Sequence, residues 1–167
     1  MKRQLLLGCG ASRRKLFNSQ EPWGDLVTLD FNEDHKPDVV WDLEKLPLPF
    51  DDNEFDEIHA IEVLEHTGAQ GDFRFFFAQF SDFWRILKPG GILFATTPRW
   101  NGQWAWGDPS HKRIINAGSL VFLSQEQYRQ EIGKTPMSDF RFCYKADFEP
   151  VFQQESESFV FALKAIK

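Results

Sequence analysis

Cysteine is scarce in this chain of 167 residues, which contains only Cys9 and Cys143 and no C-x-x-C pair. Disulfide scaffolds need several cysteines and zinc ribbons need closely spaced pairs, so the sequence excludes both classes. No apolar run approaches the roughly 18 residues of a membrane-spanning helix. The few leucines before Cys9 are also too short a run for the apolar region of an export signal. We therefore expect a cytoplasmic protein without a membrane partner.

Basic residues are outnumbered, since Lys and Arg total 19 against 25 Asp and Glu, which gives a net charge of −6. General binding to a nucleic-acid backbone usually requires a basic surface, so this balance argues against it. Hydrophobic residues make up 42% of the chain and include 18 Phe and 6 Trp, which excludes a disordered protein. The length fits one domain and no repeat or linker divides it, so we predict a single domain over residues 1–167.

Hydrophobic periodicity predicts an α/β fold. Strands are predicted at residues 4–7, 26–30, 38–42, 55–61 and 92–97. Between the last two strands, apolar side chains follow a helical period from Phe73 to Leu87, and the Lys88–Gly91 segment that follows is typical of a helix end. A strand, a helix and a strand in this order, with continuous apolar strands, indicate a parallel sheet covered by helices.

Two regions depart from simple alternation of strands and helices. Only residues 32–37 join the second and third predicted strands, whereas a helical crossover needs a dozen or more residues, so we predict that no helix lies there. Toward the C-terminus we predict a helix over residues 120–132 and two strands over residues 148–153 and 159–166. The short link between these strands permits only an antiparallel hairpin.

A glycine turn follows the first predicted strand, and Gly8 and Gly10 allow a ligand to approach the backbone closely. Asp30 ends the second strand about 20 residues later, where a carboxylate can accept both ribose hydroxyls of an adenosine. A dinucleotide-dependent oxidoreductase would need a third glycine where Arg13 stands, and the chain has no room for a substrate domain. These features alone leave open an ordinary turn or an adenosine site.

Five segments together resemble the class I S-adenosylmethionine-dependent methyltransferases, and among these the small type 11 group. The segments are Leu6-Leu7-Gly8-Cys9-Gly10, Leu29-Asp30, the proline-containing run from Asp42 to Asp56, Glu62-Val63-Leu64-Glu65-His66, and Leu87-Lys88-Pro89-Gly90-Gly91-Ile92-Leu93. The resemblance covers residues 4–98 and implies a Rossmann-like, mostly parallel seven-stranded sheet whose last strand is antiparallel. It also implies an enzyme that uses S-adenosyl-L-methionine to methylate an O or N nucleophile of a small or medium-sized molecule or a peptide.

The resemblance further implies a cofactor site of ten residues, namely Gly8, Cys9, Gly10, Asp30, Phe31, Asp42, Leu43, Ala60, Ile61 and Glu62. The backbone of the glycine turn would line the methionine end of the cofactor. Asp30 would bind the ribose hydroxyls, Phe31 would contact the adenine, and Asp42 would accept from the adenine amino group. The end of the fourth strand would lie beside the transferred methyl. We accordingly predict that Asp30→Ala weakens cofactor binding and leaves the fold intact.

Two departures from the family pattern leave an alternative open. Leu6 stands where the family often has an acid, and Ser12 replaces the third family glycine. Both positions concern contacts to the amino and carboxylate groups of the methionine. The chain is therefore either a methyltransferase or a module that binds the cofactor without catalysis, and a nucleotide-binding oxidoreductase is a third alternative.

The segment after the fifth predicted strand contains Trp100, Trp104 and Trp106 and continues into Asp108-Pro109-Ser110-His111. Ligands of open α/β sheets bind outside the carboxyl ends of the strands, so we interpret this segment as a lid or acceptor wall. The alternative is a tryptophan cluster that closes the core. We predict that Asp108 and His111 are catalytic, with His111 contributing to acceptor binding or deprotonation. In the alternative without function, Asp108 caps the turn and His111 packs against a tryptophan.

Two further polar patterns have structural as well as functional explanations. The Glu62 to His66 segment has metal-binding spacing, but an H-x-x-E-H zinc site would need His where Glu62 stands, so we interpret it as a loop with ordinary hydrogen bonds and expect no metal. Arg13-Arg14-Lys15 is either a solvated basic turn or a docking point for an acidic substrate. The motifs [DNS]-P-P-[YFW] and Pro-Cys of DNA-base methyltransferases do not follow the fourth strand, which argues against DNA bases as acceptors.

Overall fold

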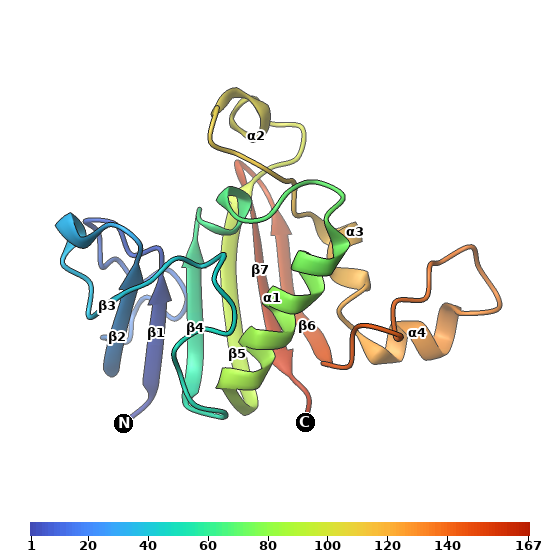
Figure 1. The fold of residues 1–167 in the computed structure, drawn as a ribbon, viewed down its shortest axis with the longest axis horizontal. Coiled ribbons are helices and arrows are strands. Elements are labelled where there is room, and N and C mark those ends of the chain that lie inside the picture. The colour runs from blue at the N-terminus through green and yellow to red at the C-terminus, as the bar shows by residue number, and fades with distance from the viewer.

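The computed structural model describes residues 1–167 and contains a seven-stranded sheet flanked by helices (Figure 1). The strands are β1 (Arg3–Leu7), β2 (Asp25–Asp30), β3 (Val39–Val40), β4 (Phe55–Ile61), β5 (Leu87–Pro98), β6 (Phe148–Glu155) and β7 (Ser158–Ala165). Their order is β3-β2-β1-β4-β5-β7-β6, and all run parallel except β7, which lies antiparallel between β5 and β6. The prediction of a mostly parallel sheet with an antiparallel last strand is confirmed.

The helices are α1 (Phe73–Ile86), α2 (Gln103–Gly107), α3 (Ala117–Val121) and α4 (Gln125–Glu131), with 3-10 turns η1 (Glu33–His35) and η2 (Leu64–His66). The helix α1 begins after Asp72, whose side chain accepts a hydrogen bond from the backbone N–H of Phe75 (3.0 Å). It lies across one face of the sheet in Figure 1. None of the helices combines the length and the apolar character that crossing a membrane demands.

The core lies between α1 and the face of the sheet that it covers. Fully buried side chains from β1, β4 and α1 meet there: Leu5, Leu7, Ile58, Phe80 and Phe83. Full burial of one such side chain contributes roughly 1.5–3 kcal/mol. The phenylalanine stripe of α1 therefore belongs to the core.

Three crossovers between parallel strands contain no α-helix, one of them the segment 41–54 between β3 and β4. The crossover from β2 to β3 forms only η1, which confirms the predicted absence of a helix. Residues 8–24, between β1 and β2, also lack a helix, which the sequence did not predict. This segment covers the face of the sheet opposite α1, where Phe17 stacks on Phe94 (ring centroids 5.1 Å apart) and Trp23 contacts His59 edge-on (4.7 Å). Aromatic packing thus takes the place of a helix on that face.

The single helix predicted over residues 120–132 is wrong, because two helices meet there. Asn116 caps α3 with a capping box, and the side chain of Ser124 caps α4 by accepting from a backbone N–H of its first turn (3.4 Å). The break buries Tyr128, whose hydroxyl donates to the carbonyl of Phe122 (2.9 Å).

Most strand boundaries differ from the prediction by one or two residues, and those of β3 and β5 have clear physical reasons. The strand β3 is limited to Val39–Val40, because the carboxylate of Asp38 accepts hydrogen bonds from the backbone N–H and the hydroxyl of Thr28 (2.8 and 2.7 Å). The strand β5 begins earlier than predicted, at Leu87, which already pairs with β4. The carboxyl ends of β1, β2 and β4 meet at one edge of the sheet, and the candidate site lies at this edge.

Candidate functional site

A cavity of about 680 Å³ opens where β1 and β2 end, beside the segment that follows β3. Its volume is in the usual range for a cofactor pocket. Six of the ten residues expected to bind a cofactor line it: Gly8, Gly10, Asp30, Phe31, Asp42 and Leu43. Four do not line it: Cys9, Ala60, Ile61 and Glu62. The structure therefore brings together the glycine turn and the residues expected around an adenosine, but not the end of β4.

The glycine turn adopts a left-handed backbone at two positions, Gly8 (φ +55°) and Gly10 (φ +52°). A Cβ atom at Gly8 would lie 2.2 Å from Cγ2 of Val63, whereas a Cβ atom at Gly10 would meet no atom within 4 Å. Close packing against the segment after β4 therefore requires glycine at position 8. At position 10 only the backbone conformation favours it.

Asp30 is buried at the end of β2, with 4% of its surface exposed. Its carboxylate accepts hydrogen bonds from the backbone N–H groups of Gly10 (2.8 Å) and Asn32 (2.9 Å), and Nδ1 of His35 lies 3.2 Å from Oδ2. Burial alone would raise the pKa of Asp30, but the two N–H groups and His35 outweigh it and lower the pKa. Asp30 is thus an ionised wall of the cavity, and it also holds the glycine turn in place, which the sequence did not indicate.

Arg13 joins the glycine turn to η1. Its guanidinium donates to the carbonyl groups of Gly10 (2.6 Å) and His35 (2.9 Å), and its own carbonyl accepts from Nε1 of Trp23 (2.6 Å). Both interpretations of the basic segment are therefore wrong for this residue, which is neither fully solvated nor free to dock an acidic substrate. Since no helix follows the turn, these contacts stabilise its conformation.

Other parts of the cavity wall come from loop residues that were not among the expected cofactor ligands, among them Trp41, Glu44, His66, Ser110 and Lys112. Glu44 connects three of these loops, because it accepts hydrogen bonds from the backbone N–H of Gly68 (2.7 Å) and from Nζ of Lys112 (2.8 Å). The hydrogen bond from Lys112 lowers the pKa of Glu44. These residues are far apart in the sequence, so only the fold reveals their proximity.

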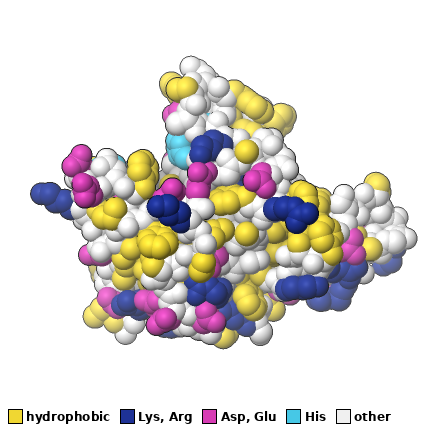
Figure 2. Space-filling model, viewed as in Figure 1, with side chains coloured by type: hydrophobic (Ala, Val, Ile, Leu, Met, Phe, Trp, Pro, Cys, Tyr) yellow, Lys and Arg dark blue, Asp and Glu magenta, His cyan; other side chains and the backbone are white.

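The tryptophan segment projects beyond the sheet as α2 and its flanking turns, at the top of Figure 1. Trp100, Trp104 and Trp106 are 48%, 66% and 73% exposed, so the alternative of a cluster that closes the core is wrong. Figure 2 shows hydrophobic side chains on the surface of this projection. Pro109 and Ser110, which follow α2, line the cavity. This position agrees with a lid or acceptor wall.

The side chains of Asp108 and His111 are neighbours without a hydrogen bond between them, although the backbone N–H of His111 donates to the carbonyl of Asp108 (3.2 Å). Asp108 accepts from the backbone N–H (2.8 Å) and the hydroxyl (2.5 Å) of Ser110, as in the alternative in which it caps the turn, and its Oδ2 lies 3.8 Å from Nε2 of His111. The ring of His111 contacts His66 edge-on (centroids 4.6 Å apart) and not a tryptophan. Neither Asp108 nor His111 lines the cavity, although the two residues between them do.

Glu65, in η2, is a buried carboxylate without a hydrogen-bond partner. It is 2% exposed, and neither of its oxygens accepts a hydrogen bond. Burial, together with the neighbouring carboxylate of Glu62, raises the pKa of Glu65 to about 8. Nε2 of His111 lies 4.0 Å from its Oε1. The Glu62 to His66 segment is therefore not a loop with ordinary hydrogen bonds.

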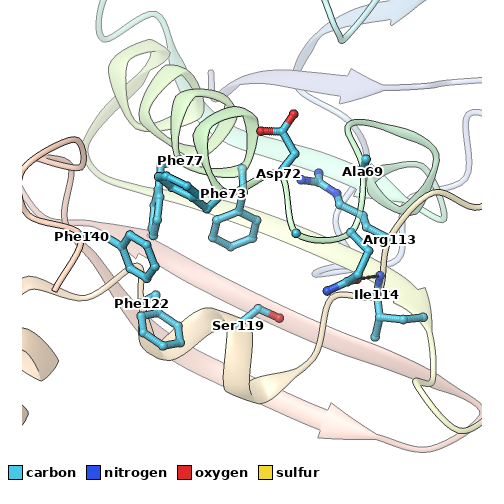
Figure 3. Close-up of a pocket in the computed structure, with 12 residues that line it drawn as sticks. Ala69, Asp72, Phe73, Phe77, Arg113, Ile114, Ser119, Phe122 and Phe140 are labelled. Carbon is cyan, nitrogen blue, oxygen red and sulfur yellow. Dashed lines mark hydrogen bonds between the residues drawn. The ribbon is translucent and has the colours of Figure 1, made fainter. Parts of the chain in front are cut away.

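Arg113 lies beside Glu65 and His111. It also lines a second cavity of about 220 Å³, shown in Figure 3. Its buried guanidinium donates to the carbonyl of Leu64 (2.9 Å) and the hydroxyl of Thr67 (2.9 Å). Aromatic side chains gather on the other side of this cavity: Phe73, Phe77, Phe122 and Phe140. The second cavity shares no lining residue with the larger one, so the two are separate.

Comparison with protein families identifies a known domain in the part of the chain that contains the glycine turn and Asp30. A family model described as a methyltransferase domain matches residues 5–95, which is more than half of the chain. Among curated proteins, the sterol 24-C-methyltransferase of Pneumocystis carinii is 29% identical over 70 residues. That match covers 42% of this chain and 17% of the relative, so the chain spans only a small part of the relative's length.

Solved structures share the fold over almost the whole chain. An S-adenosylmethionine-dependent methyltransferase from Archaeoglobus fulgidus superposes with a TM-score of 0.62 at 17% identity, covering 98% of this chain and 86% of the other. The N-methyltransferase NodS from Bradyrhizobium japonicum, in complex with S-adenosyl-L-homocysteine, gives a TM-score of 0.57 at 14% identity, covering 99% and 79%. At such identities the likeness establishes the fold alone.

Proposed function

This chain belongs to the methyltransferase domain family, and we propose that it transfers the methyl group of S-adenosyl-L-methionine to an oxygen or nitrogen nucleophile of a small or medium-sized acceptor. S-adenosyl-L-methionine is the cofactor that the family membership implies. The observation that supports the proposal is the cavity in which six of the residues expected at this cofactor meet. It lies outside the carboxyl ends of parallel strands, where open α/β sheets bind their ligands.

In this proposal the adenosine lies between Phe31 and the segment of Asp42 and Leu43. Phe31 lines the cavity and is 76% exposed, so its ring is available to an adenine. Each oxygen of a carboxylate can accept two hydrogen bonds. Oδ1 of Asp30 accepts only from Asn32, so it retains a lone pair for a ribose hydroxyl.

The methionine end of the cofactor lies toward the glycine turn and Val63 in this proposal. Cys9 lies within this turn and Ala60–Glu62 lie beside it at the end of β4, but none of these residues lines the cavity. Leu6 is buried and offers no polar group, so the amino group of the methionine must find its partners elsewhere.

Methyl transfer is a direct displacement at carbon. The nucleophile attacks the methyl carbon, the carbon–sulfur bond breaks with its electron pair on sulfur, and S-adenosyl-L-homocysteine leaves. The protein contributes mainly by aligning nucleophile, carbon and sulfur, and a protein group assists where the acceptor must lose a proton. Asp108 and His111 are the proposed acceptor-side groups, because Pro109 and Ser110 between them line the cavity under the exposed tryptophans.

The alternative of a binding module without catalysis rests on Leu6 and Ser12, which stand where the family has an acid and a third glycine. Binding of S-adenosyl-L-homocysteine is common to both functions, and only turnover separates them.

The test is calorimetric titration of the full chain with S-adenosyl-L-homocysteine and, separately, with NADH. We expect binding of the first and none of the second. The reverse result would reject the methyltransferase in favour of the oxidoreductase. Incubation with methyl-labelled cofactor and pools of small molecules and peptides should then transfer label to an acceptor. Binding without transfer to any pool would support the binding module.

A further inference from the structure

Three side chains near the cavity offer metal-ligand atoms at close range. One such atom from each of Glu65, His66 and His111 lies within 4.8 Å of the other two. Glu65 and His66 belong to η2, whereas His111 follows the tryptophan segment. The fold, and not the spacing along the sequence, therefore brings the three side chains together.

The hydrogen bonding of Glu65 provides an independent observation. Glu65 is 2% exposed and both of its oxygens lack a donor, and Nδ1 of His111, whose side chain is also buried, lacks a partner as well. A buried carboxylate without compensation is strongly unfavourable. The nearby charge of Arg113 attracts this carboxylate only in part, because the guanidinium donates to Leu64 and Thr67 and not to Glu65.

The geometry points to a divalent metal ion bound by Glu65, His66 and His111. Two imidazole nitrogens and one carboxylate form a donor set that suits Zn²⁺ and also other first-row ions such as Mn²⁺ and Co²⁺, and three protein ligands leave a coordination position open. Ligand atoms at about 2.0–2.2 Å from one ion lie about 3–4 Å apart, so small side-chain rotations close the observed separations.

Two neighbouring residues complete the surroundings of this ion. Oδ2 of Asp108 lies 3.8 Å from Nε2 of His111 and adds a negative charge beside the ion. The hydroxyl of Ser110 lies 3.0 Å from Nδ1 of His66 and orients that ring, as outer hydrogen-bond partners of metal-bound histidines do. The sequence-based expectation of no metal rested on the spacing from Glu62 to His66. His111 is distant in the sequence and was not part of that pattern.

The position of the cluster assigns the ion to the acceptor side. His66 and Ser110 line the proposed cofactor cavity, and Glu65 and His111 line a small adjacent one. The role of the ion in the reaction rests on the proposed function. In that role the ion binds a hydroxyl of the acceptor and lowers the pKa of that hydroxyl. The hydroxyl proton passes to solvent, and the oxygen forms the new bond to the methyl carbon as the carbon–sulfur bond breaks. The acceptor is then a hydroxyl compound.

The test uses the full chain, freed of metal with a chelator and titrated separately with Zn²⁺, Mn²⁺, Co²⁺ and Mg²⁺. We expect about one equivalent of at least one transition ion to remain after dialysis. At a hundredfold excess over Kd that ion should raise Tm by about 5–10 °C. Bound Co²⁺ should also give visible absorption bands characteristic of nitrogen and oxygen ligands.

Variants identify the ligands. Glu65→Gln and His111→Ala should each weaken ion binding more than about tenfold, while His35→Ala, which removes a histidine outside the cluster, should retain it. Glu65→Gln replaces an unpartnered buried carboxyl group by an amide of the same size, so without metal it should melt no lower than the wild type, and its loss of binding cannot be ascribed to unfolding. If none of the four ions binds, or if Glu65→Gln and His111→Ala bind like the wild type, the proposal is overturned and Glu65 is simply protonated.

The catalytic consequence has its own readout. Chelation should abolish methyl transfer and leave the affinity for S-adenosyl-L-homocysteine unchanged. Transfer that continues without metal refutes the role of the ion in the reaction. A metal-loaded protein that does not bind S-adenosyl-L-homocysteine refutes the proposed function instead, and leaves the metal site standing.

Discussion

Replacement of Asp30 tests the proposed cofactor site directly. In the proposed complex Asp30→Ala removes a charged acceptor for a ribose hydroxyl. A hydrogen bond to a charged group contributes about 1.5–3 kcal/mol. We therefore expect the affinity for S-adenosyl-L-homocysteine to fall about 10- to 100-fold.

The same substitution also affects the free protein. The carboxylate of Asp30 accepts from the backbone N–H groups of Gly10 and Asn32, and Asp30→Ala leaves both donors without this partner. An unsatisfied buried donor costs about 1–3 kcal/mol, and in a chain of this length each kcal/mol lowers Tm by about 2–4 °C. The sequence alone predicted an intact fold for this variant, whereas the structure predicts a measurable loss of stability.

Asp30→Asn separates the two effects. It keeps one oxygen acceptor for the glycine turn but removes the charge, so it should retain more stability than Asp30→Ala while still losing cofactor affinity. The pKa of Asp30 is lowered in the folded protein, so its contribution to stability is present above the unfolded pKa near 4 and is lost as pH falls through the lower folded value. Wild-type unfolding free energy should accordingly drop more steeply below about pH 4 than that of Asp30→Asn.

Calorimetry with S-adenosyl-L-homocysteine and urea denaturation at several pH values check these expectations. Glu149→Gln is the matched control, because it removes one exposed carboxylate from β6 and leaves the cavity unchanged. Cofactor affinity within twofold of wild type in both Asp30 variants would remove Asp30 from the site and refute the reasoning above.

Four further substitutions have distinct expected outcomes. Gly8→Ala should abolish cofactor binding and lower Tm, because its Cβ would lie 2.2 Å from Cγ2 of Val63. Gly10→Ala should cost only about 1 kcal/mol of backbone strain. Calorimetry and melting curves compare the two variants, and equal effects would contradict the packing argument. Phe80→Ala should lower the unfolding free energy by about 3–5 kcal/mol in urea, and a loss below about 1 kcal/mol would contradict its place in the core. His111→Ala should leave the affinity for S-adenosyl-L-homocysteine unchanged and reduce methyl transfer at least about tenfold, and wild-type turnover would exclude an acceptor-side role.

The sequence predicted those parts of the fold in which one periodicity is unambiguous. The helix α1 was predicted to within one residue at each end, because its 3.6-residue stripe leaves a single solution, and β4, which is buried along most of its length, was predicted over its observed residues. The C-terminal helix was mispredicted because Leu120, Leu123 and Tyr128 are all fully buried, and their spacing suits one continuous helix as well as two. Only the cap at Ser124 separates the alternatives, and a serine within an apolar pattern is ambiguous.

The candidate site was predictable only where its residues follow a strand end. Gly8, Gly10 and Asp30 end β1 and β2, and parallel strands bring their carboxyl ends to one edge. Residues such as Trp41 and Lys112 reach the cavity through loops, whose paths depend on contacts such as the pair of Glu44 and Lys112 and not on local preference. The meeting of Glu65 and His111 across more than forty residues is of the same kind, since no local pattern relates them.

The absence of a helix after β1 changes what keeps the proposed cofactor site rigid. Where a helix follows a glycine turn, its hydrogen bonds continue the turn's conformation into a regular element. Here two side chains fix the conformation of the turn: Asp30 accepts from the N–H of Gly10, and Arg13 donates to the carbonyl of the same residue. Arg13 also donates to the carbonyl of His35, whose ring lies beside Asp30, so the turn, η1 and the end of β2 form one connected polar unit. A residue whose N–H and carbonyl are both bound by charged side chains can be as well ordered as one in a helix, and the third glycine of longer motifs is dispensable because no helix has to pack there.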